Sequence, residues 1–155
     1  MKDNNYISWD EYFMGVAVLS SMRSKDPSTK VGACIVNTSK RIIGIGYNGF
    51  PYGCSDDEFP WERKGEFLDC KYPYVVHAEP NAILNSTASL ENSTLYVTLF
   101  PCHECAKLII QSGIKEIVYA NDKYDGTDSD QASKRMLDAA GVKYRKMKEV
   151  ELTIK

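Results

Sequence analysis

Two short segments carry the side chains best suited to metal chemistry: His-Ala-Glu at 77–79 and Pro-Cys-His-Glu-Cys at 101–105. Imidazole nitrogen and cysteine sulfur are preferred ligands of Zn²⁺, and cysteines three residues apart on a helix project their sulfurs to one side. We therefore predict that His77, Cys102 and Cys105 bind one zinc ion per chain. Three protein ligands leave a fourth position for water, which is typical of a catalytic site.

Glu79 lies two residues after the histidine, so it can reach the same site without being a ligand. Two thiolates cancel the charge of Zn²⁺, and such an ion acidifies its water less than an all-histidine site does. A neighbouring base is then useful, and we predict that Glu79 moves protons during catalysis. Pro80 fits the first turn of a helix, where a missing N–H costs nothing.

Other interpretations of these cysteines stay open. Cys102-x-x-Cys105 alone would also suit a structural zinc site or a redox pair, and His77 alone would suit an ordinary surface histidine. A structural site needs a fourth ligand and has no use for an unligated carboxylate, so Glu79 favours the catalytic alternative.

Three further residues could in principle form a second zinc site: Cys54, Cys70 and His103. No close ligand spacing links them, and a lip or surface position is the simpler account of His103. Cys34 falls inside a β-rich run, where a small buried apolar side chain is the ordinary explanation.

Composition sets bounds on the class of protein. The chain has 155 residues, 43% of them hydrophobic, and a formal net charge of −2 without long basic clusters. We expect one domain over 1–155, no nucleic-acid partner and, without a run of about 18 apolar residues, no membrane span. The polar first residues lack the apolar core of a signal peptide, and a Cys-x-x-Cys pair indicates a reducing, cytoplasmic compartment.

The first part of the chain predicts a helix and a hairpin. Ser8 and Glu11 have the spacing of a capping box, and apolar residues recur at helical spacing over 9–22. Residues 31–36 and 41–47 are β-rich and joined by a turn. The stretch 48–74 is rich in Gly and Pro, and an irregular segment of that length is typically functional.

Strands and helices alternate after that segment. A short helix is expected from about 78, followed by the strands and helices at 94–98, 102–111, 116–119, 131–140 and 143–148. A hairpin followed by this alternation predicts an α/β fold: a three-layer α/β/α domain around a mixed sheet of about five strands.

The motifs also carry a resemblance. His-x-Glu followed by Pro-Cys-x-x-Cys is the signature of zinc-dependent nucleobase deaminases. The sequence adds GYNG at 46–49, PYGCSDD at 51–57 and HAEPNAI at 77–83. With these motifs, the stretch from about Ser8 to Tyr124 resembles the deoxycytidylate deaminases of the cytidine and deoxycytidylate deaminase family. Pro80 and His103 depart from the family pattern without removing a catalytic group.

The resemblance implies a cytidine-deaminase-like fold and zinc-dependent conversion of dCMP to dUMP, which supplies thymidylate synthesis. Zinc would be bound by His77, Cys102 and Cys105, and Glu79 would shuttle the protons. The resemblance also implies a homohexamer that is activated by dCTP and inhibited by dTTP.

The same resemblance suggests binding residues, each with a plainer alternative. Asn48 would contact the sugar or serve as a turn residue, and Tyr124 would wall the base pocket or be a half-buried aromatic. Ser24 and Lys25 would contact the phosphate or belong to a solvated loop. The candidates for the effector site are Tyr47, Asn48 and Gly49.

Several functions remain compatible with the sequence. An enzyme that deaminates dCTP as well as dCMP would keep every motif. A nucleoside or polynucleotide deaminase is a second alternative, although a polynucleotide substrate predicts a basic channel that the charge does not suggest. A zinc-stabilised binding module is the alternative outside enzymes.

Overall fold

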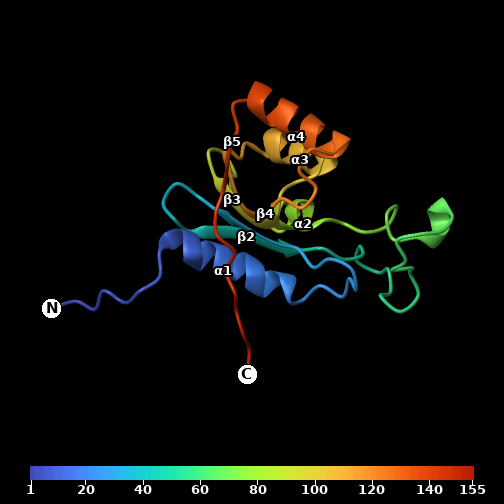
Figure 1. The fold of residues 1–155 in the computed structure, drawn as a ribbon, viewed down its shortest axis with the longest axis horizontal. Coiled ribbons are helices and arrows are strands. Elements are labelled where there is room, and N and C mark those ends of the chain that lie inside the picture. Colours follow the sequence, from blue (N-terminus) through green and yellow to red (C-terminus); the bar gives the residue numbers. More distant parts are fainter.

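A mixed five-stranded sheet lies at the centre of the computed structural model, which describes residues 1–155 (Figure 1). The strand order is β2-β1-β3-β4-β5. β1 pairs antiparallel with β2 and β3, whereas β3, β4 and β5 are parallel neighbours. The strands are β1 (Gly32–Val36), β2 (Ile42–Tyr47), β3 (Thr94–Leu99), β4 (Glu116–Asn121) and β5 (Lys143–Lys146).

Helices cover both faces of this sheet, which confirms the predicted three-layer α/β fold. Figure 1 shows α1 on one face and α3 and α4 on the other. None of these helices is long and apolar enough to cross a bilayer. The helices are α1 (Trp9–Ser21), α2 (Ala78–Leu84), α3 (His103–Ser112) and α4 (Asp128–Ala139), with a short 3₁₀ turn at Phe67–Asp69.

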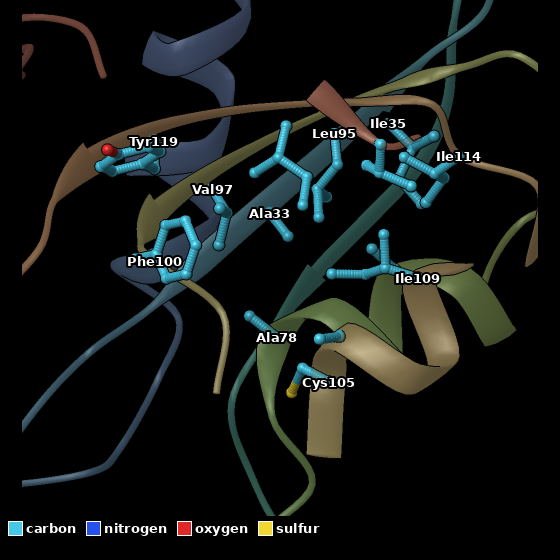
Figure 2. Packing of buried hydrophobic residues seen from close by; sticks show 14 of the residues in the cluster. Ala33, Ile35, Ala78, Leu95, Val97, Phe100, Cys105, Ile109, Ile114 and Tyr119 are labelled. Atoms are coloured by element: carbon cyan, nitrogen blue, oxygen red, sulfur yellow. The ribbon is translucent and has the colours of Figure 1, made fainter. Parts of the chain in front are cut away.

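The central strand β1 shows how the sequence builds two cores. Its five residues are all buried, as expected of a strand with both faces covered. Ala33 and Ile35 pack with α2, α3 and α4, as Figure 2 shows in part. Cys34 and Val36 point to α1. Cys34 is fully buried, and burial raises its thiol pKa to about 12, so the predicted apolar role is confirmed.

Local capping explains where the helices begin. The predicted capping box is present, because Ser8 and Glu11 exchange side-chain and backbone hydrogen bonds. The helix predicted from 131 begins three residues earlier, at Asp128. The reason is that Thr127 caps it by accepting a hydrogen bond from the Asp130 N–H.

The irregular segment between β2 and α2 has its own support. A short antiparallel bridge between Gly49 and Val76 joins its two ends. Inside it, the Phe50 ring lies 4.1 Å from Trp61 and 5.7 Å from Phe59, measured between ring centroids. The segment has little regular secondary structure, and packing within this aromatic cluster stabilises it instead. It extends beside the sheet (Figure 1).

Met14 provides a test of the core between α1 and the sheet, because it is fully buried whereas Met22 is 40% exposed. Met14→Ala should lower the free energy of unfolding by about 2–5 kcal/mol, through lost burial and the cavity that remains. Met22→Ala should cost less than about 1 kcal/mol. Chemical denaturation measures both values, and equal losses would contradict the assigned packing.

Candidate active site

Three donor atoms from two helix N-termini converge at one point. The Nδ1 atom of His77 lies 3.2 Å from the Cys105 sulfur and 3.5 Å from the Cys102 sulfur. All three donors lie within 4.8 Å of one another. Tetrahedral zinc with ordinary bond lengths separates such donors by roughly 3.5–3.8 Å. The donor types and their spacing therefore fit Zn²⁺ closely.

The local fold explains this convergence. His77 is the N-cap residue of α2 and Cys102 is the N-cap residue of α3, with Cys105 on the first turn of α3. The sequence analysis placed Cys102 inside the helix, one residue too early for the start of α3. Because α3 follows β3, its N-terminus lies at the carboxyl end of the parallel strands, where ligand sites in open sheets occur. Both helix termini contribute positive potential that favours thiolate.

The sulfur atoms form one coupled group. A hydrogen bond from Cys105, reinforced by His77, lowers the pKa of Cys102 to about 4. The same contact with Cys102, together with burial, raises the pKa of Cys105. The hydrogen bond to Cys102 also raises the pKa of His77. The lowered pKa of Cys102 favours the thiolate form that a metal ligand requires.

Glu79 lies beside the donors without joining them. Its side chain is 4% exposed, and its carboxylate is not part of the metal-ligand cluster. Burial raises the pKa of Glu79 to about 7, although the His77 charge acts in the opposite direction. A carboxyl group with a pKa near neutrality exchanges protons readily, which is the property expected of a general acid–base residue.

A cavity of about 410 Å³ opens onto this cluster. Its walls include His77, Glu79 and Cys102 at one end, with Phe100 and Tyr124 among its apolar surfaces. Small-molecule sites commonly enclose about 300–1,000 Å³ and combine apolar walls with a few polar groups. The cavity therefore has the size and lining of a site for a small organic substrate. The expected contact of Tyr124 with the base stays a prediction.

Asn48 also lines this cavity, but its amide is engaged with the backbone. Its Oδ1 accepts a hydrogen bond from the Val31 N–H, and its Nδ2 donates to the Thr29 carbonyl, both at 2.9 Å. Asn48 therefore ties the end of β2 to the chain before β1. The expected contact with a sugar stays a prediction.

The expected phosphate contacts at Ser24 and Lys25 do not line the cavity. The Ser24 hydroxyl is buried and donates to the Asn48 carbonyl. Lys25 pairs with Asp56 at a separate hollow beside Cys54. Both side chains are thus used elsewhere, and neither lies among the residues that face the cavity.

Sequence reasoning missed several charged residues that line the cavity, among them Asp26, Arg63 and Lys71. Three further aspartates, Asp122, Asp125 and Asp130, line it as well. Lys71 Nζ lies 2.6 Å from Asp26 Oδ2, and both side chains are buried. Arg63 is exposed and belongs to none of the ion pairs. Arg63 and Lys71 lie in the irregular segment, and that location was the available signal.

The remaining candidates lie outside the metal cluster. Tyr47 lines a different hollow, near Leu19 and Met22, and Gly49 forms the bridge to Val76. His103 is exposed, with its Nδ1 2.8 Å from the Ser129 hydroxyl. Cys54, Cys70 and His103 form no second group of converging ligands.

Comparison with protein families gives one match that covers most of the chain. Residues 7–121 match the family described as the cytidine and deoxycytidylate deaminase zinc-binding region. The matched range includes the three metal-ligand candidates and Glu79.

Individual proteins give the same result. The chain is 57% identical to the deoxycytidylate deaminase of Mus musculus over 147 residues, covering 94% of this chain and 83% of the relative. It is 59% identical to a probable deoxycytidylate deaminase of Drosophila melanogaster over 152 residues, covering 94% of this chain and 75% of the relative. A dCMP deaminase from cyanophage S-TIM5, solved with dCMP and dUMP, superposes with a TM-score of 0.72 at 29% identity. That superposition covers 92% of this chain and all of the phage protein.

Metal content distinguishes the ligands from the proton carrier. Cys105→Ala should lose bound zinc and some thermal stability, because metal binding and folding are coupled through the ligands. Glu79→Gln should keep about one zinc per chain, because the carboxylate lies outside the donor cluster. Metal analysis of the purified proteins measures both. Zinc retained by Cys105→Ala, or lost from Glu79→Gln, would contradict the assignment.

The buried Asp26–Lys71 pair should appear in the pH dependence of stability. Burial opposes the charge on Asp26, yet Lys71 and the backbone N–H groups of Ser28 and Thr29 lower its pKa below 3.8. Its stabilising contribution is therefore complete above pH 3.8 and is lost as the pH falls through the lower, folded-state pKa.

Asp26→Asn should accordingly be less stable than the wild type at pH 5–7, since it leaves Lys71 buried without a counter-charge. The difference in Tm should begin to narrow as the pH falls below about 4, where Asp26 of the unfolded chain takes up a proton, and should go on narrowing down to the lower folded-state pKa of Asp26. Thermal melts across this range measure the difference. A constant difference at every pH would show that the charge of Asp26 is not its source.

Proposed function

Because the chain belongs to the cytidine and deoxycytidylate deaminase family, we propose that it is a zinc-dependent dCMP deaminase that hydrolyses dCMP to dUMP and ammonia. The family match and the relatives at 57–59% identity support the reaction type. The similarity to a phage protein solved with dCMP and dUMP supports the nucleotide.

One observation carries the proposal: three zinc-type donors meet beside a buried carboxylate that is outside the donor cluster, next to a cavity of about 410 Å³. A structural zinc site would surround the ion with four ligands. Here only three such donors converge, and the cavity is lined by two of the residues that supply them, His77 and Cys102. This arrangement favours a catalytic site over a zinc-stabilised binding module.

The residues of the chain divide the reaction between them. His77, Cys102 and Cys105 would hold zinc, and the chemistry that zinc supplies at such an open site is a lower pKa for a water molecule. Glu79 accepts the proton of that water as its oxygen bonds to C4 of cytosine. Glu79 passes this proton to ring N3. It then takes the second proton from the new C4 hydroxyl group and delivers it to the amino group, so that the C4–N bond breaks, ammonia leaves and the C4 carbonyl of uracil forms. Burial of Glu79 suits both directions of transfer, because it keeps the carboxyl pKa near 7.

The cavity wall indicates how a phosphate would be held. Lys71 already faces the Asp26 carboxylate, so much of its charge is neutralised within the protein. Arg63 lines the same cavity without an ion-pair partner, and its guanidinium matches phosphate oxygens in geometry. Arg63 is therefore the basic group that supports a nucleotide substrate over a nucleoside.

The finer expectations extend the proposal. We infer a cytoplasmic homohexamer that supplies dUMP for thymidylate synthesis and is activated by dCTP and inhibited by dTTP, as the resemblance implies. Large exposed apolar side chains support assembly, since they include Ile7, Phe67 and Leu84, each at least 59% exposed. Tyr47, Asn48 and Gly49 remain candidates for the effector site.

The substrate test compares dCMP with deoxycytidine, followed by the ultraviolet change of cytosine becoming uracil. Wild-type protein should prefer dCMP, because phosphate binding holds the base in place and lowers the barrier to reaction. Arg63→Ala should reduce kcat/KM for dCMP by about 10–100-fold and leave deoxycytidine almost unchanged. Glu79→Gln should be inactive on both.

Lys25→Ala is the matched control, because Lys25 lies at a separate hollow. It should leave the preference for dCMP intact. If Lys25→Ala lost the preference for dCMP and Arg63→Ala kept it, the phosphate contact predicted for Lys25 from the sequence would be supported instead. Equal turnover of both substrates by the wild type would remove the nucleotide assignment and favour a nucleoside deaminase.

A further inference from the structure

Helix α2 carries Glu79 and starts directly after His77, yet little within the helix itself fixes its position. It has seven residues, and no side chain caps its N-terminus. Isolated helices this short are unstable in water, so packing against neighbours must determine where the helix lies. The position of Glu79 therefore depends on whatever holds α2.

Two asparagines, Asn81 on α2 and Asn85 at its C-cap, bond to the backbone of the edge strand β2. Asn81 Nδ2 donates to the Tyr47 carbonyl at 2.7 Å, and Asn85 Nδ2 donates to the Ile45 carbonyl at 3.1 Å. Four residues of helix advance about 6 Å and two residues of antiparallel strand advance about 6.8 Å. The spacing thus allows both bonds when the helix runs alongside the strand.

Two glycines let α2 approach β2 at backbone distance. A Cβ at Gly44 would lie 2.6 Å from the Ala82 carbonyl oxygen, and a Cβ at Gly46 would lie 2.5 Å from the Ala78 carbonyl oxygen. Ala78 and Ala82 are themselves fully buried. The helix therefore rests on the strand without intervening side chains, and only a small shift is possible before the asparagine bonds break.

We propose that Asn81 is a positioning residue for Glu79, acting by fixing α2 on β2. Asn81 and Glu79 are two residues apart, so they project about 200° apart around the helix axis. Asn81 bonds to β2 while Glu79 lines the cavity. A rotation of α2 that breaks the Asn81 bond consequently moves the Glu79 carboxylate relative to the cavity and the metal ligands.

This inference deepens the proposed function and rests on it, because it assigns a role in placing the proton carrier. Displacements of about 1 Å at a catalytic group can cost roughly 100-fold in rate. Loss of the Asn81 bond should therefore reduce kcat far more than it reduces substrate affinity. A residue that only stabilised the fold would lower the amount of folded protein without changing kcat per folded molecule.

The test uses the full-length zinc protein and Asn81→Ala. We expect kcat for dCMP to fall about 10–100-fold and KM to change less than about threefold. Zinc should stay at about one per chain. Hydrogen exchange should become faster at the α2 amides, beyond any change at β3 and β4, because local opening then exceeds global opening.

Asn37→Ala is the matched control. Asn37 accepts hydrogen bonds from the Ser39 and Arg41 N–H groups in the turn between β1 and β2, at the end of β2 opposite Tyr47. This variant should lose stability without a change in kcat or in α2 exchange. Should Asn81→Ala fail to fold, Asn85→Ala provides the same measurement with an exposed residue and a smaller expected fall in kcat.

Two results would overturn the inference: an unchanged kcat for a folded Asn81→Ala, or an equal fall in kcat for Asn37→Ala. Unchanged α2 exchange would also overturn it, because the asparagine bond would then not hold the helix. Turnover of dCMP by the wild type decides the proposed function separately, and the exchange measurement does not depend on it.

Discussion

His77, Cys102 and Cys105 can share one ion only while the N-termini of α2 and α3 stay together, and much of the fold serves that requirement. The two helices pack on the same face of the sheet, where Ala78 and Cys105 belong to one core. Figure 2 shows the Cys105 sulfur close to Ala78 at the edge of that core. The parallel pairing of β3 with β4 fixes the loop from which α3 begins. The positions of the three donors thus depend on the packing of the larger core.

The same arrangement explains the environment of Glu79. A carboxyl group so well buried would be costly without nearby positive charge, and the cluster supplies His77 together with two helix N-termini. On the other side, the buried Asp26–Lys71 pair joins the loop before β1 to the irregular segment. That segment supplies Arg63 and Lys71 to the cavity wall, and a long-range ion pair and a small aromatic cluster help to hold it. Regular hydrogen bonding between strands contributes only the bridge at Gly49 and Val76.

Local signals were sufficient to predict the layers and the three donors that converge, because capping, periodicity and the Cys-x-x-Cys spacing each involve residues close in sequence. The cavity wall was not predictable in this way. Lys71 and Asp26 are 45 residues apart, and the sequence pattern around neither residue predicts that they form an ion pair. Lys25 precedes Asp26 directly, yet the chain directs one towards Asp56 and the other into the cavity. The bonds of Asn81 and Asn85 likewise depend on the approach of α2 to β2, which the sequence of neither element shows alone.

The asparagine bonds have a consequence for the surface of the sheet. β2 is an edge strand, and edge strands normally expose backbone carbonyl groups that can pair with a strand from another molecule. The carbonyls of Ile45 and Tyr47 already accept hydrogen bonds from α2. A strand added at this edge would find those acceptors in use and a helix beside them. The contacts that hold α2 on β2 therefore also leave fewer free backbone acceptors at this edge for a strand of a second molecule.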